Sequence, residues 1–127
     1  MTATISQIDV FNIDMPLVDT FTSGGLAKNI THCVVVRITD ADGAVGISSI
    51  DPSSKAVSPN TAPDLAIAIR DRVGPALIGE DPVNVNRIVE IASKLAPTQP
   101  GASAGVELAC IELVCQRMGV AMHDYVG

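Results

Sequence analysis

The residues best suited to chemistry are few, and their spacing argues against a metal or thiol site. Cys33, Cys110 and Cys115 lack the C-x-x-C spacing of zinc sites, and only two histidines are present. His32 and Cys33 are neighbours on a predicted strand, where successive side chains point to opposite faces. We therefore expect buried, unreactive thiols in a reducing compartment and no metal ligands within the chain.

One serine lies in the pattern Gly101-Ala-Ser103-Ala-Gly105, which matches the G-x-S-x-G motif of hydrolase nucleophiles. That motif requires a strand leading directly into the serine, with acidic and histidine partners following it. Pro97-Thr-Gln-Pro100 precedes this serine instead. We interpret the small residues as permitting close packing at a helix start, and we predict no catalytic residue in the chain.

Composition excludes several classes of partner. The 127 residues include 8 Lys and Arg against 14 Asp and Glu, a net charge of −6 that would repel nucleic acid. Hydrophobic residues make up 47%, yet no run approaches the roughly 18 apolar residues of a membrane span.

The N-terminus resembles no signal peptide, so a cytoplasmic location is expected. Aromatic residues make up only 2%, so an aliphatic core is predicted.

The first third of the chain has the pattern of strands. Ile5 to Ile13 is predicted to be a strand that Pro16 closes, because proline lacks the amide hydrogen that a sheet ladder needs. His32 to Thr39 alternates apolar and polar residues, and Ala44 to Ile50 follows as its hairpin partner. Asp40 to Gly43 forms the tight turn between them.

Two segments rich in Ser, Thr, Gly and Pro are predicted to be long loops. They span Val18 to Leu26 and Asp51 to Pro59. Connections of this length in a compact domain usually bind something or lack order.

Helical periodicity begins after the second loop. The first helix is predicted from the cap Thr61 to Gly74-Pro75, and the second begins with Asp81 as N-cap and Pro82 as its first residue. The third runs from about Ala102 to Met118, with Gly119 after its end.

The third helix is apolar in nearly all directions between Leu108 and Cys115. Such a helix must be buried on all sides, so we expect its far side to meet another body. The alternative is a central helix that this domain wraps alone. The predicted fold is α+β, a three-stranded antiparallel sheet followed by a three-helix bundle.

This order of elements resembles the N-terminal capping domain of the enolase superfamily, in the mandelate racemase/muconate lactonizing enzyme group. The matching stretches cover nearly the whole chain. They are Val34 to Gly46, Pro75 to Pro82, Ala104 to Leu113, Arg117 to Ala121, and Asp124 to Gly127.

The resemblance implies that residues 1–127 are a capping domain, with residues from about 120 leading toward an absent β/α barrel. A barrel alone needs roughly 200 residues or more, so it is not within this chain. The barrel would carry the Mg²⁺ ligands and the Lys or His bases that remove a proton α to a carboxylate. The capping domain would contribute two substrate-binding segments. By position these are Thr20, Phe21, Thr22 and Ser23, and Ile50, Asp51 and Pro52.

The resemblance thus implies the capping part of a racemase, cycloisomerase or dehydratase, inactive without its barrel. Its partners would be the barrel of the same or another chain, a small carboxylate substrate and further copies in a homo-oligomer. The alternative is a stand-alone α+β binding or oligomerisation module that uses the third helix as an interface.

Overall fold

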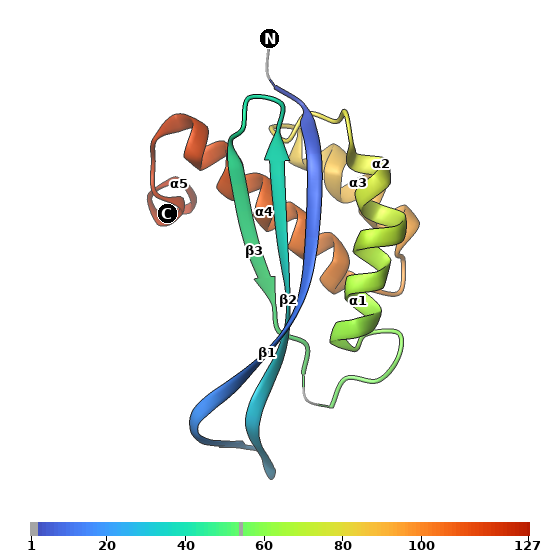
Figure 1. Ribbon diagram of the computed structural model, residues 1–127, viewed down its shortest axis with the longest axis vertical. Coiled ribbons are helices and arrows are strands. Elements are labelled where there is room, and N and C mark those ends of the chain that lie inside the picture. Colours follow the sequence, from blue (N-terminus) through green and yellow to red (C-terminus); the bar gives the residue numbers. More distant parts are fainter. Residues whose placement is uncertain (1–2, 54) are drawn as a thin grey trace.

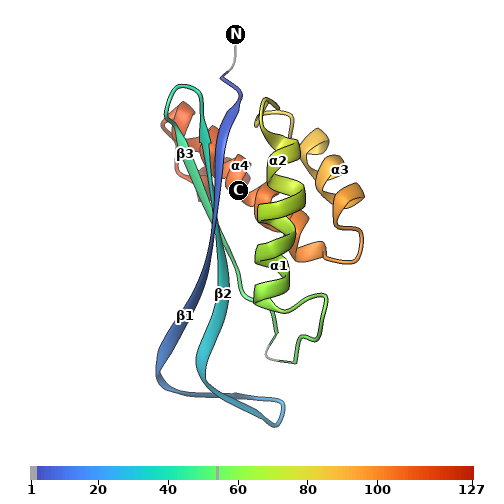
Figure 2. The same ribbon diagram turned by 45° about the vertical axis from the view of Figure 1, so that its right-hand side comes forward.

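The computed structural model describes residues 3–53 and 55–127 of the chain. Three strands form an antiparallel sheet in the order β1-β2-β3: β1 (Ile5–Ser23), β2 (Leu26–Asp40) and β3 (Val45–Ile50). The helices cover one face of this sheet (Figures 1 and 2). The predicted α+β class is confirmed.

Six helical segments follow the sheet in the described part of the chain. They are α1 (Ala62–Ala68), a π-helical turn η1 (Ile69–Val73), α2 (Gly74–Leu77), α3 (Val85–Leu95), α4 (Pro100–Met118) and α5 (Met122–Val126). The first three are continuous, so with α3 and α4 they make the three predicted helical rods. The short α5 was not predicted.

The predicted loop from Val18 to Leu26 is wrong, because this segment is the far end of a long β1–β2 hairpin. Pro16 pairs with Ile30 and does not end β1. A proline is tolerated there because β1 is an edge strand, where a missing amide hydrogen breaks no ladder. Gly24 and Gly25 both have positive φ, as a two-residue hairpin turn requires.

The β2–β3 hairpin is confirmed, and Asp40 holds its turn. The Asp40 carboxylate accepts hydrogen bonds from the backbone amides of Asp42 (2.8 Å) and Ala44 (2.9 Å). Gly43 supplies the positive φ of the turn. The carboxylate is fully buried, so its interactions stabilise the fold rather than serve a reaction.

Gly74-Pro75 does not stop the first helix, contrary to the prediction. The amide of Gly74 donates to the Ile69 carbonyl five residues earlier, and Pro75 needs no donor in the first turn of α2. The π-helical turn therefore carries the chain through the proline to Leu77. The predicted N-cap at Thr61 is confirmed, since its hydroxyl accepts from the Asp64 amide.

The second predicted helix begins three residues later than expected. Asn84 is the N-cap of α3, with its side chain accepting from the Arg87 amide. Asp81 instead accepts from the Val83 amide in a preceding turn, and Pro82 is buried. Asp and Asn cap helices with similar preference, so residue type alone did not separate the two positions.

The third predicted helix, α4, begins at Pro100 and ends with Gly119 in the left-handed conformation. It lies between the sheet and α3 (Figure 2). This domain buries seven of its 19 positions, and the expectation that the remaining surface meets another body stays a prediction. Leu108 stays 40% exposed. Met118, the last residue of the same helix, is 50% exposed, so this domain covers α4 only in part.

Small residues bring α4 against the sheet. A Cβ added at Gly105 would lie 2.3 Å from Cδ1 of Ile50, and one at Gly46 would lie 2.0 Å from the carbonyl oxygen of Ala109. The Ser48 hydroxyl donates to the Gly105 carbonyl at this contact. The glycines around Ser103 thus permit close packing, as predicted, and form no nucleophile elbow.

The core is aliphatic, as the composition predicts. Its largest fully buried side chains include Ile38, Ile69, Leu77, Ile88 and Leu113. All three cysteines are buried and unpaired by disulfides. Burial raises the pKa of the Cys110 thiol to about 12, so this group is neutral and unreactive at ordinary pH.

Candidate substrate-capping site

Three polar side chains meet where the β1–β2 hairpin leaves the sheet. The Thr31 hydroxyl lies 2.8 and 2.9 Å from the two carboxylate oxygens of Asp51. The Lys28 ammonium group donates to the Thr31 oxygen at 3.0 Å and lies 3.7 Å from Asp51. Thr31 is 7% exposed, whereas the Asp51 side chain is 50% exposed and faces solvent as well.

A break in strand pairing positions this group. Regular β1–β2 pairing holds as far as Met15 with Thr31 and Pro16 with Ile30, then shifts and resumes with Phe21 and Lys28. Residues 17–20 of β1 lie between these pairs against Asn29 alone on β2, and such a bulge bends a hairpin and increases its twist. Figure 1 shows the far half of the hairpin bending away from the sheet below this point.

Phe21 and Lys28 are cross-strand partners beyond the bulge. The ammonium group lies 6.0 Å from the centroid of the Phe21 ring, at the limit of a cation–π contact. Phe21 as a residue is 56% exposed. An exposed aromatic ring beside a lysine and a carboxylate offers apolar contact and both signs of charge to a ligand.

Adjoining depressions surround these side chains, and we call them together the hairpin cleft. All share Lys28 and Asp51 in their lining. The one on the side away from the helices has a volume of about 410 Å³ and is also lined by Leu17, Val18, Asp19, Phe21 and Thr31. The one toward α1 has a volume of about 160 Å³.

The structure brings together most of the residues expected from the family resemblance. Phe21, Ser23, Asp51 and Pro52 line the hairpin cleft. Thr20 and Thr22 lie on the same arm of β1 but do not line these depressions.

Ile50 points elsewhere, since its side chain packs against the core and beside Gly105. Strand alternation explains the separation, because Ile50 and Asp51 face opposite sides of the chain.

Sequence reasoning missed Lys28 and Thr31. Both lie just before the strand that was predicted to begin at His32, in a segment without apolar periodicity. The available signal was the pair of glycines at positions 24 and 25. If that pair is read as a hairpin turn, counting outward places Lys28 opposite Phe21.

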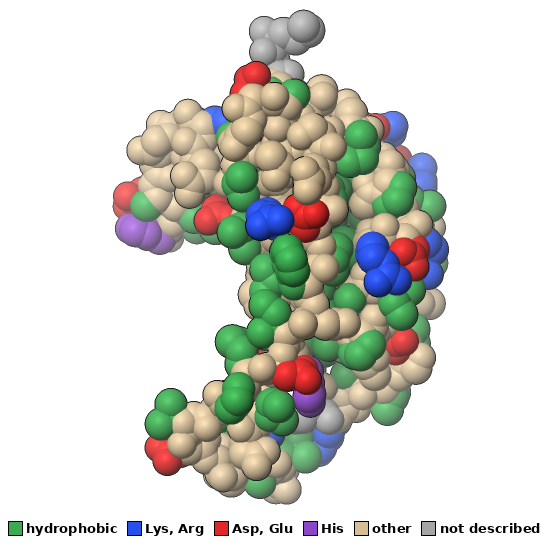
Figure 3. Space-filling model, in the orientation of Figure 1, with side chains coloured by type: hydrophobic (Ala, Val, Ile, Leu, Met, Phe, Trp, Pro, Cys, Tyr) green, Lys and Arg blue, Asp and Glu red, His purple; other side chains and the backbone are tan. Residues whose placement is uncertain are grey.

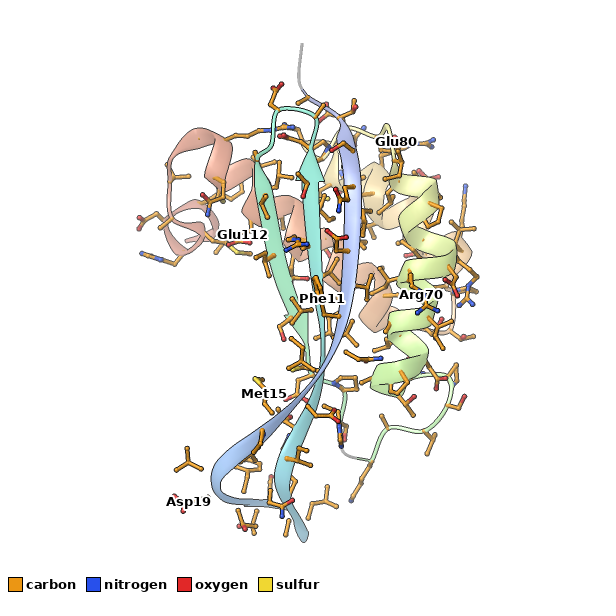
Figure 4. The ribbon with its side chains drawn as sticks, viewed as in Figure 1. Phe11, Met15, Asp19, Arg70, Glu80 and Glu112 are labelled. Carbon is orange, nitrogen blue, oxygen red and sulfur yellow. The ribbon has the colours of Figure 1, made fainter. Side chains whose placement is uncertain are left out.

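The sheet face away from the helices carries an apolar strip beside the hairpin cleft. We call Phe11, Ile13, Met15 and Ile47 the outer-face strip, and each is between 37% and 50% exposed. Figure 3 shows hydrophobic side chains along the hollowed side of the molecule, and Figure 4 shows Phe11 and Met15 projecting from this face. Met15 is paired with Thr31, so the strip continues into the hairpin cleft.

One ion pair lies on the same face. The Arg37 guanidinium lies 5.2 Å from the centroid of the Phe11 ring and donates to Asp9 at 3.0 and 3.1 Å. Hydrogen bonds from Gln7 and then from Arg37 lower the pKa of Asp9. The charges of Arg37 and Asp9 thus neutralise each other at the edge of the outer-face strip.

The described residues offer no ligand set for a metal ion. No three His, Cys, Asp or Glu side chains within 3–53 and 55–127 lie close enough together to hold one. Within the same ranges, no helix is both long and apolar enough to span a bilayer.

The sequence of this chain matches a known protein family and several characterised enzymes. Residues 5–127 match the family model described as mandelate racemase / muconate lactonizing enzyme, N-terminal domain. The chain is 26% identical over 126 residues to cis-3-hydroxy-L-proline dehydratase from Roseibium aggregatum, covering 97% of this chain and 34% of that protein. It is 25% identical to muconate cycloisomerase 1-1 from Acinetobacter lwoffii, covering 98% and 33%.

A solved structure shares the fold closely. The crystal structure of the dipeptide epimerase from Enterococcus faecalis V583, complexed with Mg and the dipeptide L-Leu-L-Tyr, superposes with a TM-score of 0.88 at 26% identity. The match covers 98% of this chain and 34% of that one. The chain thus spans about a third of the length of the relatives it matches.

Proposed function

The chain belongs to the mandelate racemase / muconate lactonizing enzyme N-terminal domain family, and from this premise we propose that it caps the active site of such an enzyme. The reaction would be proton abstraction α to a carboxylate in a racemase, epimerase, cycloisomerase or dehydratase. The base and Mg²⁺ would lie in a second, barrel domain, and this domain would bind the distal part of a small carboxylate substrate. Cytoplasmic location and homo-oligomeric assembly stay predictions of the sequence.

The observation that carries this proposal is the hairpin cleft. Phe21 and Asp51 come from the two segments that the family resemblance implies, 30 positions apart, and line one cleft. Phe21 would exclude water from a substrate below it, since its exposed ring offers apolar area without a hydrogen-bonding demand. The Lys28 and Asp51 charges would orient polar groups of that substrate.

The outer-face strip supports docking of the barrel on this domain. An antiparallel sheet with one wet face normally alternates apolar and polar residues, with the polar ones outward. Here the outward positions Phe11, Ile13 and Met15 are apolar instead. Because the strip leads into the hairpin cleft, a barrel on this face would have the cleft beside it. Residues from about 120, including α5, would lead toward it.

Replacing Phe21 by alanine in the intact polypeptide tests the capping function. We expect KM to rise about tenfold, the equivalent of about 1.4 kcal/mol of lost contact, with a smaller change in kcat. The substrate would first be chosen from dipeptides, hydroxyprolines and muconates by turnover. Ile67→Ala removes a side chain on α1 that is also about half exposed and should leave KM unchanged. An unchanged KM in Phe21→Ala would contradict a capping role for this ring.

The docking surface predicts behaviour of the 127-residue chain expressed alone. We expect it to self-associate or to bind a hydrophobic dye, because the outer-face strip is then uncovered. Replacing Phe11 and Ile47 by serine should lower the dye fluorescence, whereas Ile67→Ser, at 45% exposure against 50% for Ile47, should not. A monomer that binds no dye would show that this face needs no partner.

A further inference from the structure

We propose that Lys28, Thr31 and Asp51 form a latch that fastens the segment after β3 to the β1–β2 hairpin, so that the two capping segments move as one unit. The inference rests on the proposed function, because it concerns how the same site is held in shape. Thr31 is a positioning residue in this proposal.

The contacts of Thr31 use its hydroxyl group in both directions. The oxygen accepts from the Lys28 ammonium at 3.0 Å, and the single hydroxyl proton is donated to Asp51, whose two oxygens lie at 2.9 and 2.8 Å. Hydrogen bonds to charged groups are about twice as strong as neutral ones. Because Thr31 is buried, water competes weakly for these bonds.

The latch lies where the backbone ladder stops holding the two segments together. Ile50 pairs with Val34 in the last β2–β3 pair, so Asp51 is the first residue that the sheet no longer holds. On the other side, the β1–β2 register shifts between Pro16 and Phe21. Where the hairpin bends and backbone pairing ends, the side-chain hydrogen bonds of Thr31 therefore connect the hairpin to the segment after β3.

Lys28 extends the latch to the aromatic side of the cleft. The same ammonium group that donates to Thr31 lies 3.7 Å from Asp51 and near the Phe21 ring, on the paired strand. Loss of the Thr31 hydroxyl would therefore remove the donor to Asp51 and the acceptor for Lys28, and would leave only the 3.7 Å ion pair between these two side chains. Both capping segments would loosen together, although Thr31 itself belongs to neither.

Thr31→Val in the intact polypeptide tests the latch, because valine keeps the shape and removes the hydroxyl. We expect amide hydrogen exchange at Lys55 and Ala56, whose amides donate to Ser53, to become about tenfold faster. KM should rise while kcat stays within about twofold, because the reacting groups are elsewhere. Thr31→Ser restores the hydroxyl and should restore the wild-type exchange. Thr39→Val, at the opposite end of β2, should change neither measurement.

Unchanged exchange in a folded Thr31→Val protein would overturn the latch. If Thr31→Val does not fold, Lys28→Met gives the second measurement, since this side chain is 25% exposed and methionine keeps an unbranched apolar chain while removing the ammonium group. Wild-type exchange in Lys28→Met would then overturn the proposal, and faster exchange would support it. One further outcome separates the latch from the capping function. If exchange is faster in the variants, but added substrate does not slow amide exchange at Phe21 or Ser53 of the wild type, the latch is supported and the capping function is contradicted.

Discussion

Gly46→Ala is expected to destabilise the domain by about 3 to 5 kcal/mol, enough to abolish folding of a marginal protein. The added Cβ would lie 2.0 Å from the carbonyl oxygen of Ala109 and 2.5 Å from the amide nitrogen of Leu113. Both atoms belong to the backbone of α4, which cannot rotate away as a side chain can. Relief would require β3 and α4, the main contact between sheet and helices, to separate.

Chemical denaturation with matched variants would measure this effect. Gly101→Ala is the control, because its Cβ would meet side-chain atoms and no backbone, the nearest being Cδ1 of Leu65 at 3.0 Å. Alanine also favours helix over glycine, so the control should stay within about 1 kcal/mol of the wild type. A Gly46→Ala protein as stable as Gly101→Ala would show that β3 and α4 are farther apart than described.

Arg117→Leu is expected to cost about 3 to 5 kcal/mol, because it leaves a buried carboxylate without its cation. The Arg117 guanidinium donates to Asp40 at 2.8 Å and also to the Ala3 carbonyl. The Asp40 side chain is fully buried and that of Arg117 is 19% exposed. Lys94→Leu removes half of an exposed pair with Glu90 and should cost less than about 0.5 kcal/mol. Equal losses in the two variants would contradict the importance of the buried pair.

The buried pair of Arg117 and Asp40 also makes the free energy of unfolding depend on pH in a predictable direction. Burial alone would raise the pKa of Asp40, but hydrogen bonds from Arg117 and from the Ala44 and Asp42 amides outweigh it and lower the pKa below 3.8. In the wild type this contribution is therefore complete above the unfolded pKa and is lost as pH falls through the lower, folded pKa.

In Arg117→Leu the carboxylate keeps its burial and loses its cation, so we expect its pKa to rise. Protonation then relieves the penalty. The stability gap between variant and wild type should narrow as pH falls from about 7 toward about 3. A gap that widens over this range would show that Asp40 is not the group concerned.

The sheet shows where prediction from short sequence patterns succeeds and where it fails. Asp40 to Gly43 predicted the β2–β3 turn correctly, because an Asx-type turn is stabilised within a few residues of itself. Pro16 misled the prediction of β1, because proline ends a central strand but not an edge strand. Which strand lies at the edge depends on the whole sheet.

The candidate site divides in the same way. The order of motifs pointed to Phe21 and Asp51 as capping residues, and the structure places both at one cleft. Thr31 has no local signal, since its role arises from Lys28 three residues away and Asp51 twenty residues away. A hydrogen bond between distant segments is visible only when the fold has brought them together.

The sequence by itself determined the family, the α+β order and the aliphatic core, because motif order, periodicity and composition are properties of neighbouring residues. Only the tertiary structure decided which apolar side chains stay exposed to solvent. The sheet and α3 bury seven positions of the third helix, whereas Leu108 and Met118 stay 40% and 50% exposed, and a second exposed apolar area lies on Phe11, Ile13, Met15 and Ile47. Burial depends on how layers stack, and periodicity shows which face of an element is apolar without showing what covers it.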